Sequence, residues 1–178
     1  MNQDIYAEWL VKRKTPAWVP LAWILFVIAL LGSILFTMMN QFGFIAFMLV
    51  IVAFYFIAQR FKVEYEYIFV TNELSIDRIL SQKSRKRMIT ISMSDVEKVV
   101  PFGSHDLDFI KNNPTVKPVD YSSGDKSNDA KKYAILFSKG GQQVIYFEPN
   151  EHVLKCMKTV APHKIFLADA ANGTNRIA

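Results

Sequence analysis

Two long apolar runs near the N-terminus constrain this chain more than any other feature of its sequence. They cover Ala17–Met39 and Phe42–Ala58, contain no charged residue, and are separated only by Asn40 and Gln41. Because a helix rises about 1.5 Å per residue, a bilayer core of about 30 Å needs about 20 apolar residues. The two runs therefore predict a membrane-spanning helical hairpin over residues 17–60.

The positions of Lys and Arg predict how this hairpin is oriented. Lys12, Arg13 and Lys14 precede the first run, Arg60 and Lys62 follow the second, and the connection between the runs is uncharged. Since cytoplasmic flanks are enriched in Lys and Arg, we expect both ends of the chain in the cytoplasm. A cleavable signal peptide fits less well, because its apolar region measures only about 7–15 residues. We therefore expect a multi-pass protein of the cell membrane.

The first 16 residues carry a separate pattern. Ile5, Trp9 and Leu10 form an apolar set against Asp4 and Glu8. Such a set fits a short amphipathic helix that lies in the membrane interface, and a frayed terminus fits it equally. Residues 1–16 are accordingly expected to be a cytoplasmic segment separate from the domain that follows the spans.

After the second run the apolar residues recur with a period of two, which is typical of β-strands. The first strand covers Val63–Phe69 and ends at a turn, Thr71–Glu73. Three further strands are predicted around Leu74–Leu80, Ile89–Met93 and Val96–Pro101. The short connections between them predict an antiparallel meander.

The stretch Gly103–Lys132 is rich in Gly, Ser, Asn, Asp and Pro, and it predicts little regular structure. Within it, Val116–Tyr121 suggests one more strand. Regular structure returns in Tyr133–Phe137 and Val144–Phe147, which flank the turn Lys139–Gly141. Because glycine adopts positive φ at little cost, these two strands predict a hairpin.

The last predicted element is an amphipathic helix. Asn150 is suited to cap its N-terminus, Val153, Met157 and Val160 recur at helical spacing, and Pro162 ends it. The helix closes a folded domain that is expected to cover residues 61–162.

The predicted fold class follows from this order of elements. It is an α+β membrane protein, in which the helical hairpin precedes an antiparallel sandwich or barrel of about seven strands with a C-terminal helix. Residues 163–178 are expected to form a flexible tail.

The strand sequences resemble those of bacterial pleckstrin-homology-like (PH-like) domains. The matching residues are Tyr65–Ile76, the basic Ser84–Arg87, Ile89–Ile91 and Asp95–Val99. Domains of this kind place a Tyr-x-hydrophobic-Thr-Asn strand and turn before a basic hairpin, often directly after paired membrane spans. The resemblance covers Phe61–Val160, and the chain with its N-terminal segment also resembles small two-span bacterial membrane proteins. It implies a PH-like fold and no particular activity.

A basic stretch between the second and third strands is the main candidate binding surface. If the first strand leaves the membrane at its start, the second returns toward it and brings residues 81–87 close to the headgroups. An anionic leaflet attracts each nearby cation by about 1 kcal/mol. The residues expected to bind lipid are Lys83, Arg85, Lys86 and Arg87, with Lys12, Arg13 and Lys14 in the same belt.

Other interpretations of these charges stay open. A solvated hairpin end, or contact with a protein partner, fits the same residues. Nucleic acid fits least, because the basic residues are not interleaved with stacking aromatic side chains.

Residues with catalytic or metal-binding chemistry are sparse in this sequence. His105, Asp106 and Asp108 form one cluster of metal-ligand type, but no further His or Cys lies at a useful spacing. Cys156 lies beside the apolar face of the C-terminal helix, where a thiol is typically a packing residue. Gly-rich phosphate loops, nucleophile elbows and zinc motifs are absent from the sequence. We therefore expect no enzyme, no catalytic residue, no cofactor and no metal site.

These observations favour a non-enzymatic, membrane-anchored binding or scaffold module on the cytoplasmic face. Its expected partners are the bilayer, anionic headgroups, and a protein partner or second copy bound at a sheet edge or beside the C-terminal helix. The alternative is a structural or accessory subunit of a larger membrane complex, such as a transporter or an enzyme, with the hairpin as its interface.

Overall fold

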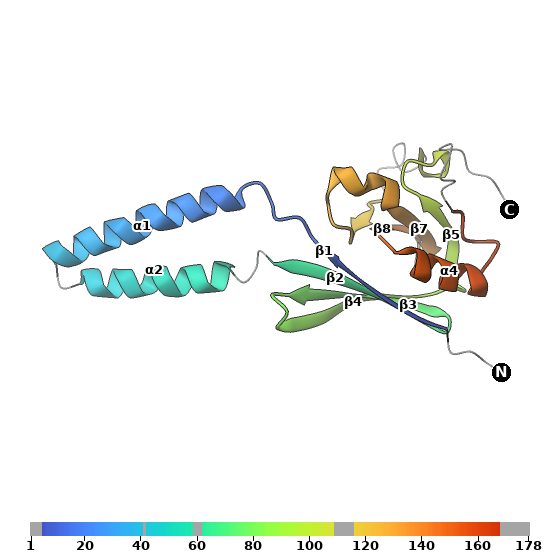
Figure 1. Ribbon diagram of the computed structural model, residues 1–178, viewed down its shortest axis with the longest axis horizontal. Coiled ribbons are helices and arrows are strands. Elements are labelled where there is room, and N and C mark those ends of the chain that lie inside the picture. The colour runs from blue at the N-terminus through green and yellow to red at the C-terminus, as the bar shows by residue number, and fades with distance from the viewer. Residues whose placement is uncertain (1–4, 41, 59–61, 109–115, 168–178) are drawn as a thin grey trace.

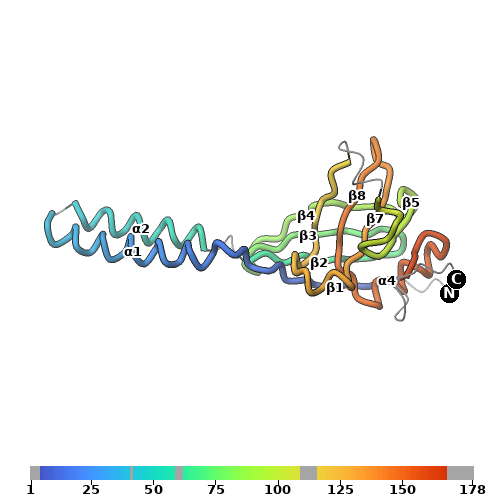
Figure 2. Tube along the Cα trace, turned by 90° about the horizontal axis from the view of Figure 1, so that it is seen from above, coloured from blue at the N-terminus to red at the C-terminus, as the bar shows by residue number. Residues whose placement is uncertain are grey.

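A pair of helices projects from a domain of two β-sheets (Figure 1). The computed structural model describes residues 5–40, 42–58, 62–108 and 116–167 of the 178-residue chain. Figure 2, turned by 90°, shows the same separation between the helical hairpin and the sheets. The predicted α+β class is confirmed, with the helices N-terminal to most of the strands.

The hairpin consists of helix α1, Val19–Met39, and helix α2, Gly43–Ala58. Among the described residues, α1 alone is long and apolar enough to cross a membrane, whereas α2 is a shorter apolar helix of 16 residues. The helices pack through stacked rings of Phe26 and Phe54, whose centroids lie 3.6 Å apart. Most of their large apolar side chains are nevertheless exposed.

Glycine is required where the two helices meet. A Cβ atom at Gly43 would lie 2.3 Å from the backbone of Thr37 in α1, closer than two atoms can approach. A larger residue at position 43 would therefore push the helices apart at their turn.

The N-terminal segment is a strand, so the predicted interfacial helix or frayed terminus is wrong. Strand β1, Tyr6–Lys12, pairs antiparallel with strand β2, Val63–Val70, along its whole length. Ala7 and Val11 are buried in the core. The spacing of apolar residues fits one face of a helix, but the edge of β2 offers backbone hydrogen bonds that a short isolated helix cannot match.

Because β1 and β2 are neighbours, the helical hairpin is an insertion between two adjacent antiparallel strands. Register runs from Tyr6 opposite Val70 to Lys12 opposite Glu64. The Arg13 backbone N–H then donates to the Val63 carbonyl at 2.9 Å. The chain thus leaves the sheet and returns to it at adjacent positions, and the predicted domain boundary at residue 61 separates β1 from the sheet to which it belongs.

The first sheet, called sheet A, has the strand order β1-β2-β3-β4. Strands β3, Glu73–Leu80, and β4, Ser84–Ser92, confirm the predicted meander in this part of the chain. The β3–β4 register shifts between Ile76 and Asp77, which leaves Met88 without a partner residue and makes a β-bulge.

The second sheet, called sheet B, has the order β5-β7-β8-β6. Strands β7, Tyr133–Ser138, and β8, Gln142–Phe147, form the predicted antiparallel hairpin. The predicted continuation of the meander into β5, Val96–Pro101, is wrong, because β5 leaves sheet A and pairs antiparallel with β7. Strand β6 covers only Val119–Asp120 and pairs parallel with β8, so the meander does not extend through this segment. The turn glycines, at positions 140 and 141, both have positive φ, 72° and 136°.

The additional strand predicted over Val116–Tyr121 forms only in part, as β6, and two short 3-10 helices lie on either side of it in the chain. They cover His105–Leu107 and Lys126–Lys131. Val116 and Tyr121 are buried although they lie outside strand β6. Packing against the core fixes this segment where local periodicity is weak.

Helix α4, Glu151–Val160, closes one side of the core. The Asn150 side chain accepts a hydrogen bond from the Val153 N–H at 2.8 Å, which confirms the predicted N-cap. Its buried residues pack with side chains from both sheets, among them Tyr67, Phe69, Ile76, Phe137 and Phe147.

The domain extends beyond the predicted end at residue 162. Ile165 is buried, and the Phe166 N–H donates to the Val99 carbonyl at 2.9 Å. The start of the predicted flexible tail is therefore held against β5. The remainder of that prediction, residues 168–178, lies outside the described residues.

Candidate functional site

The basic turn lies beside the segment in which the chain leaves the helical hairpin, as its position in the sequence predicts. Leu80, at the end of β3, is opposite Val63, and the Ser81 N–H donates to the Lys62 carbonyl at 2.8 Å. We call this edge of the domain, where β1 and β2 join the helices, the hairpin end of sheet A. Figure 1 shows the β3–β4 turn directed toward the helices.

Two of the four cations predicted there are engaged with carboxylates on the outer face of sheet A. Arg85 Nε donates to Asp77 Oδ2 at 2.7 Å, and Arg87 Nε donates to Asp77 Oδ1 at 2.9 Å. Arg85 also forms an ion pair with Glu66. The Asp77 side chain is only 4% exposed, so the arginines cover it. Arg85 and Arg87 consequently offer less charge to a lipid surface than the sequence suggests.

The two carboxyl groups respond differently to this environment. Burial would raise the pKa of Asp77, but hydrogen bonds from Arg87 and Arg85 outweigh it and hold that pKa below its ordinary value. Burial and a hydrogen bond with Glu8 raise the pKa of Glu66. The outer face is therefore a network of opposed charges.

A different set of cations lies on the inner face, which points toward the core. Arg78 is opposite Tyr65 in β2 and opposite Lys86 in β4. Arg13 Nη1 donates to the Tyr65 hydroxyl at 2.7 Å, and its guanidinium lies 5.8 Å from the centre of that ring. Strands β3 and β4, with the residue that follows β1, thus bring Arg13, Arg78 and Lys86 to the hairpin end of the inner face.

Arg78 was not among the residues expected to bind a ligand. The sequence does contain a signal for this residue. One face of β3 carries Leu74, Ile76, Arg78 and Leu80, so a single cation stands among three apolar residues. A charge at a core-facing position needs a partner, so such an interruption marks a site.

A cavity of about 500 Å³ opens at this place, and we call it the junction cavity. Its walls come from the hairpin and from sheet A: Arg13, Lys14, Pro16, Trp18, Ile57, Val63, Tyr65 and Arg78. The Arg78 Nε atom is inaccessible to solvent, and among the described residues it has no hydrogen-bond partner. The cavity therefore joins apolar walls to a cation with an unsatisfied buried donor.

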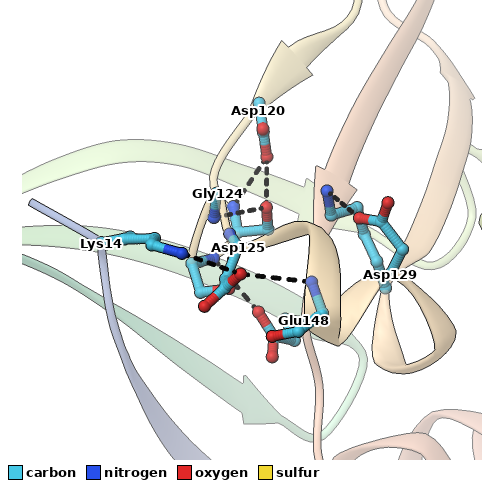
Figure 3. A network of polar contacts seen from close by, with 10 residues as sticks. Lys14, Asp120, Gly124, Asp125, Asp129 and Glu148 are labelled. Carbon is cyan, nitrogen blue, oxygen red and sulfur yellow. Dashed lines mark hydrogen bonds and ion pairs between the residues drawn. The ribbon is translucent and has the colours of Figure 1, made fainter. Parts of the chain in front are cut away.

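Lys14, which also lines this cavity, is anchored by the loop that follows β6. Its Nζ atom lies 3.1 Å from Asp125 Oδ1, and Figure 3 shows this pair within a wider polar network. In the same network the Ser123 N–H donates to Glu148 Oε2 at 3.1 Å. Hydrogen bonds from Ser127, together with Lys14, lower the pKa of Asp125. The network fixes the chain just before α1 to sheet B.

A second and larger cavity, of about 1030 Å³, lies between β1 and the start of α4. Trp9, Leu10, Leu154 and Leu167 contribute apolar surface to it, and Lys12 and Glu151 contribute charge. It occupies the position predicted for a groove beside the C-terminal helix.

The residues considered for metal or thiol chemistry do not form one common site. His105 Nδ1 lies 3.2 Å from Asp108 Oδ2, whereas Asp106 pairs with Lys98 at 3.3 Å. Cys156 is partly buried and packs against the core. Within the described part of the chain, no group of three His, Cys, Asp or Glu side chains could hold a metal ion.

Comparison with protein families decides to which group this fold belongs. A family described as "Bacterial PH-like domain (DUF6106)" matches residues 3–167. The chain belongs to this bacterial PH-like family. The resemblance seen in the strand sequences is thereby confirmed.

The match also shows how far the PH-like unit extends. It begins before β1 and includes the helical hairpin, both sheets and the segment that packs on β5 after α4. In this bacterial PH-like protein the hairpin is thus an internal part of the matched region, in agreement with its insertion between β1 and β2. No curated protein and no solved structure matches the chain.

Proposed function

We propose that this bacterial PH-like protein is a membrane-anchored, non-enzymatic binding or scaffold module. In this proposal both helices span the cell membrane, both termini are cytoplasmic, and the two-sheet domain lies against the inner leaflet. PH-like domains are generally non-enzymatic binding modules, which supports this class of function.

The exposed apolar hairpin is the observation that carries the proposal. In helix α1 only Val19 and Ser33 are buried among the described residues, and in α2 only Gly43 is. Most of the large apolar side chains of both helices are exposed, and the helices themselves project away from the sheets (Figure 2). Because exposed apolar patches of this size are rare in soluble proteins, a bilayer is the natural surrounding for the pair.

The shorter helix α2 fits this arrangement. A helix of 16 residues spans about 24 Å, a few Å less than the hydrocarbon core. Local thinning of the bilayer accommodates such a mismatch at modest cost. Trp18 before α1 and Tyr55 in the last turn of α2 then lie at the same interface, where such side chains are enriched.

Cations at the hairpin end of sheet A support contact with anionic headgroups. Lys12, Lys83 and Lys86 are exposed there and form no ion pair among the described residues. Such cations orient a tethered domain on an anionic leaflet. The cavity between β1 and α4 remains a surface suited to a protein partner.

Membrane integration and labelling from the two sides test the proposal. In a Cys156→Ser background, Asn40→Cys places a thiol at the helical turn and Lys126→Cys places one on the sheet domain. We expect the protein to resist alkaline carbonate extraction. A membrane-impermeant maleimide added to intact cells should label Asn40→Cys and should label Lys126→Cys only after lysis.

Two results would overturn the proposal. Release of the protein by carbonate would exclude the anchor, and labelling of Lys126→Cys in intact cells would exclude the orientation. Stoichiometric co-purification of other membrane proteins, lost when the helices are altered, would instead favour a structural subunit of a larger complex.

A further inference from the structure

The junction cavity contains two guanidinium groups that no carboxylate of the described residues neutralises. Among the described residues, neither Arg13 nor Arg78 forms an ion pair, in contrast to Arg85 and Arg87 on the outer face. Arg13 is positioned by the Tyr65 hydroxyl, which leaves the rest of its guanidinium to other partners. A cation pair of this kind favours an anionic ligand.

The surroundings of Arg78 are the strongest evidence for an anionic ligand. Its neighbours on the inner face of β3 are Ile76, which is fully buried, and Leu80, which is half-buried. Its Nε atom is buried without a partner, and leaving a buried donor of a charged group unsatisfied is costly. An apolar residue at position 78 would avoid that cost, so the arginine is best explained by an external acceptor that enters the cavity.

The chemistry of the lining defines that acceptor. Guanidinium groups bind phosphate through short, charge-assisted and often bidentate hydrogen bonds. The opposite wall is apolar and comes from the ends of the helices, Trp18 before α1 and Ile57 in the last turn of α2. A ligand that fills the cavity should therefore carry a phosphate group next to a hydrocarbon part.

The depth at which the cavity lies indicates where its ligand comes from. The cavity lies where α1 begins and α2 ends. If the hairpin spans the bilayer, this is the depth of the phosphate groups of the inner leaflet.

We propose that the junction cavity binds the phosphate group of an anionic phospholipid, held by Arg13 and Arg78, with Trp18 and Ile57 against its glycerol and upper acyl region. The inference rests on the proposed function, since a lipid of the leaflet reaches the cavity only if the hairpin is in the membrane.

Thermal unfolding of the full chain in a nonionic detergent tests the site. Dioctanoyl phosphatidylglycerol, dioctanoyl phosphatidylcholine and inorganic phosphate are titrated separately. We expect phosphatidylglycerol to raise the melting temperature in a saturable manner and the other two ligands to have little effect. If inorganic phosphate raises the melting temperature as much as phosphatidylglycerol does, the site binds free phosphate and the lipid assignment is overturned. If phosphatidylcholine raises it equally, the proposed selectivity for an anionic lipid is overturned.

Arg78→Gln is the decisive variant, because among the described residues the buried Nε atom of Arg78 has no hydrogen-bond partner that the substitution would remove. Without lipid we expect its melting temperature to equal or exceed that of the wild type, while its apparent affinity for phosphatidylglycerol falls about tenfold or more. Lys83→Gln removes the same charge from the adjacent turn, outside the cavity, and should change the affinity little. An unchanged lipid response in Arg78→Gln, or an equal loss in Lys83→Gln, would overturn the proposal.

The failure of this site and the failure of the proposed function are distinguishable. If the protein resists carbonate extraction, and the wild type and Arg78→Gln bind lipid equally well, the membrane anchor is supported and the phosphate site is excluded. A chain that carbonate releases contradicts the anchor whatever the titration gives.

Discussion

At the scale of single residues, buried polar groups fix this fold more tightly than exposed charges do. The Tyr67 hydroxyl donates to the Tyr121 carbonyl at 2.7 Å and accepts from the Glu148 N–H at 3.2 Å. Burial raises the pKa of Tyr67, which keeps the hydroxyl protonated as the donor. One side chain of sheet A thereby satisfies two backbone groups in the segments that flank sheet B.

Tyr67→Phe should therefore destabilise the protein without changing its fold. Removing the hydroxyl leaves two buried backbone groups unpaired, and we expect a loss of about 1–3 kcal/mol in the free energy of unfolding. Denaturant unfolding in detergent measures this loss. The control is Tyr6→Phe, because the Tyr6 hydroxyl is exposed and donates to the exposed Glu8 rather than to a buried backbone group. Equal stability of Tyr67→Phe and the wild type would contradict the role of the hydroxyl.

Asp77 should give the protein a measurable acid sensitivity. Its pKa is lower in the folded state, so its pairs stabilise the fold above the unfolded pKa of about 3.9 and are lost as the pH falls through the lower folded value. Asp77→Asn should cost about 1–2 kcal/mol near pH 7. Its further loss of stability on acidification below about pH 4 should be smaller than that of the wild type.

Unfolding curves of both proteins near pH 7, pH 5 and pH 3 test this expectation. Asp95→Asn is a suitable control, because Asp95 lies in a turn at the other end of β4 and pairs with neither arginine. Parallel acid profiles of the wild type and Asp77→Asn would contradict it.

At the scale of elements, long-range pairing overrides local pattern at two strands. The alternation from Ile91 and Ile89 would place Arg87 and Arg85 on the core face of β4. The bulge at Met88 reverses this alternation, so both arginines reach Asp77 on the outer face and Lys86 lies opposite Arg78 instead. Likewise β1 becomes a strand only because β2 is beside it.

Substitutions in β1 distinguish a strand from an interfacial helix. Val11 is 7% exposed and faces the core, whereas its neighbour Leu10 is 38% exposed on the other face. Val11→Ala should cost about 1–3 kcal/mol of unfolding free energy, while Leu10→Ala should cost about 0.5 kcal/mol or less. Denaturant unfolding of the two variants provides the comparison. Equal small effects would show that β1 does not contribute to the core.

At the scale of the whole molecule, the helical hairpin and the sheet domain are joined by two adjacent connections. One leads from β1 to α1 and the other from α2 to β2, and the two strands pair directly. Two links restrict the orientation of the domain more than a single flexible tether would. The same geometry holds the junction cavity between the two parts.

This topology predicts how a soluble form can be made. Replacing residues 16–61 by a linker of about four residues should close β1 and β2 into an ordinary hairpin, since Arg13 and Val63 are hydrogen-bonded neighbours. A fragment that begins at Phe61 lacks β1 and should aggregate or unfold, because Tyr65 and Tyr67 lose part of their cover. Size-exclusion chromatography and melting temperature compare the two. Equal folding of both proteins would contradict the role assigned to β1.

The sequence by itself determined the features that local patterns encode. The apolar runs specified α1 and α2, the period of two specified most strands, glycines at positions 140 and 141 specified the hairpin, and Asn150 and Pro162 bounded α4. Each depends on residues that are close in the chain, where backbone preference and side-chain spacing act directly.

Only the tertiary structure decided the rest. It turned residues 6–12 into β1, made the hairpin an insertion, engaged Arg85 and Arg87 with Asp77, and brought Arg13 and Arg78 together in one cavity. These features join residues that are about 50 or more positions apart, or depend on a bulge in the register of two strands. Their energies come from partners that no local window of the sequence contains.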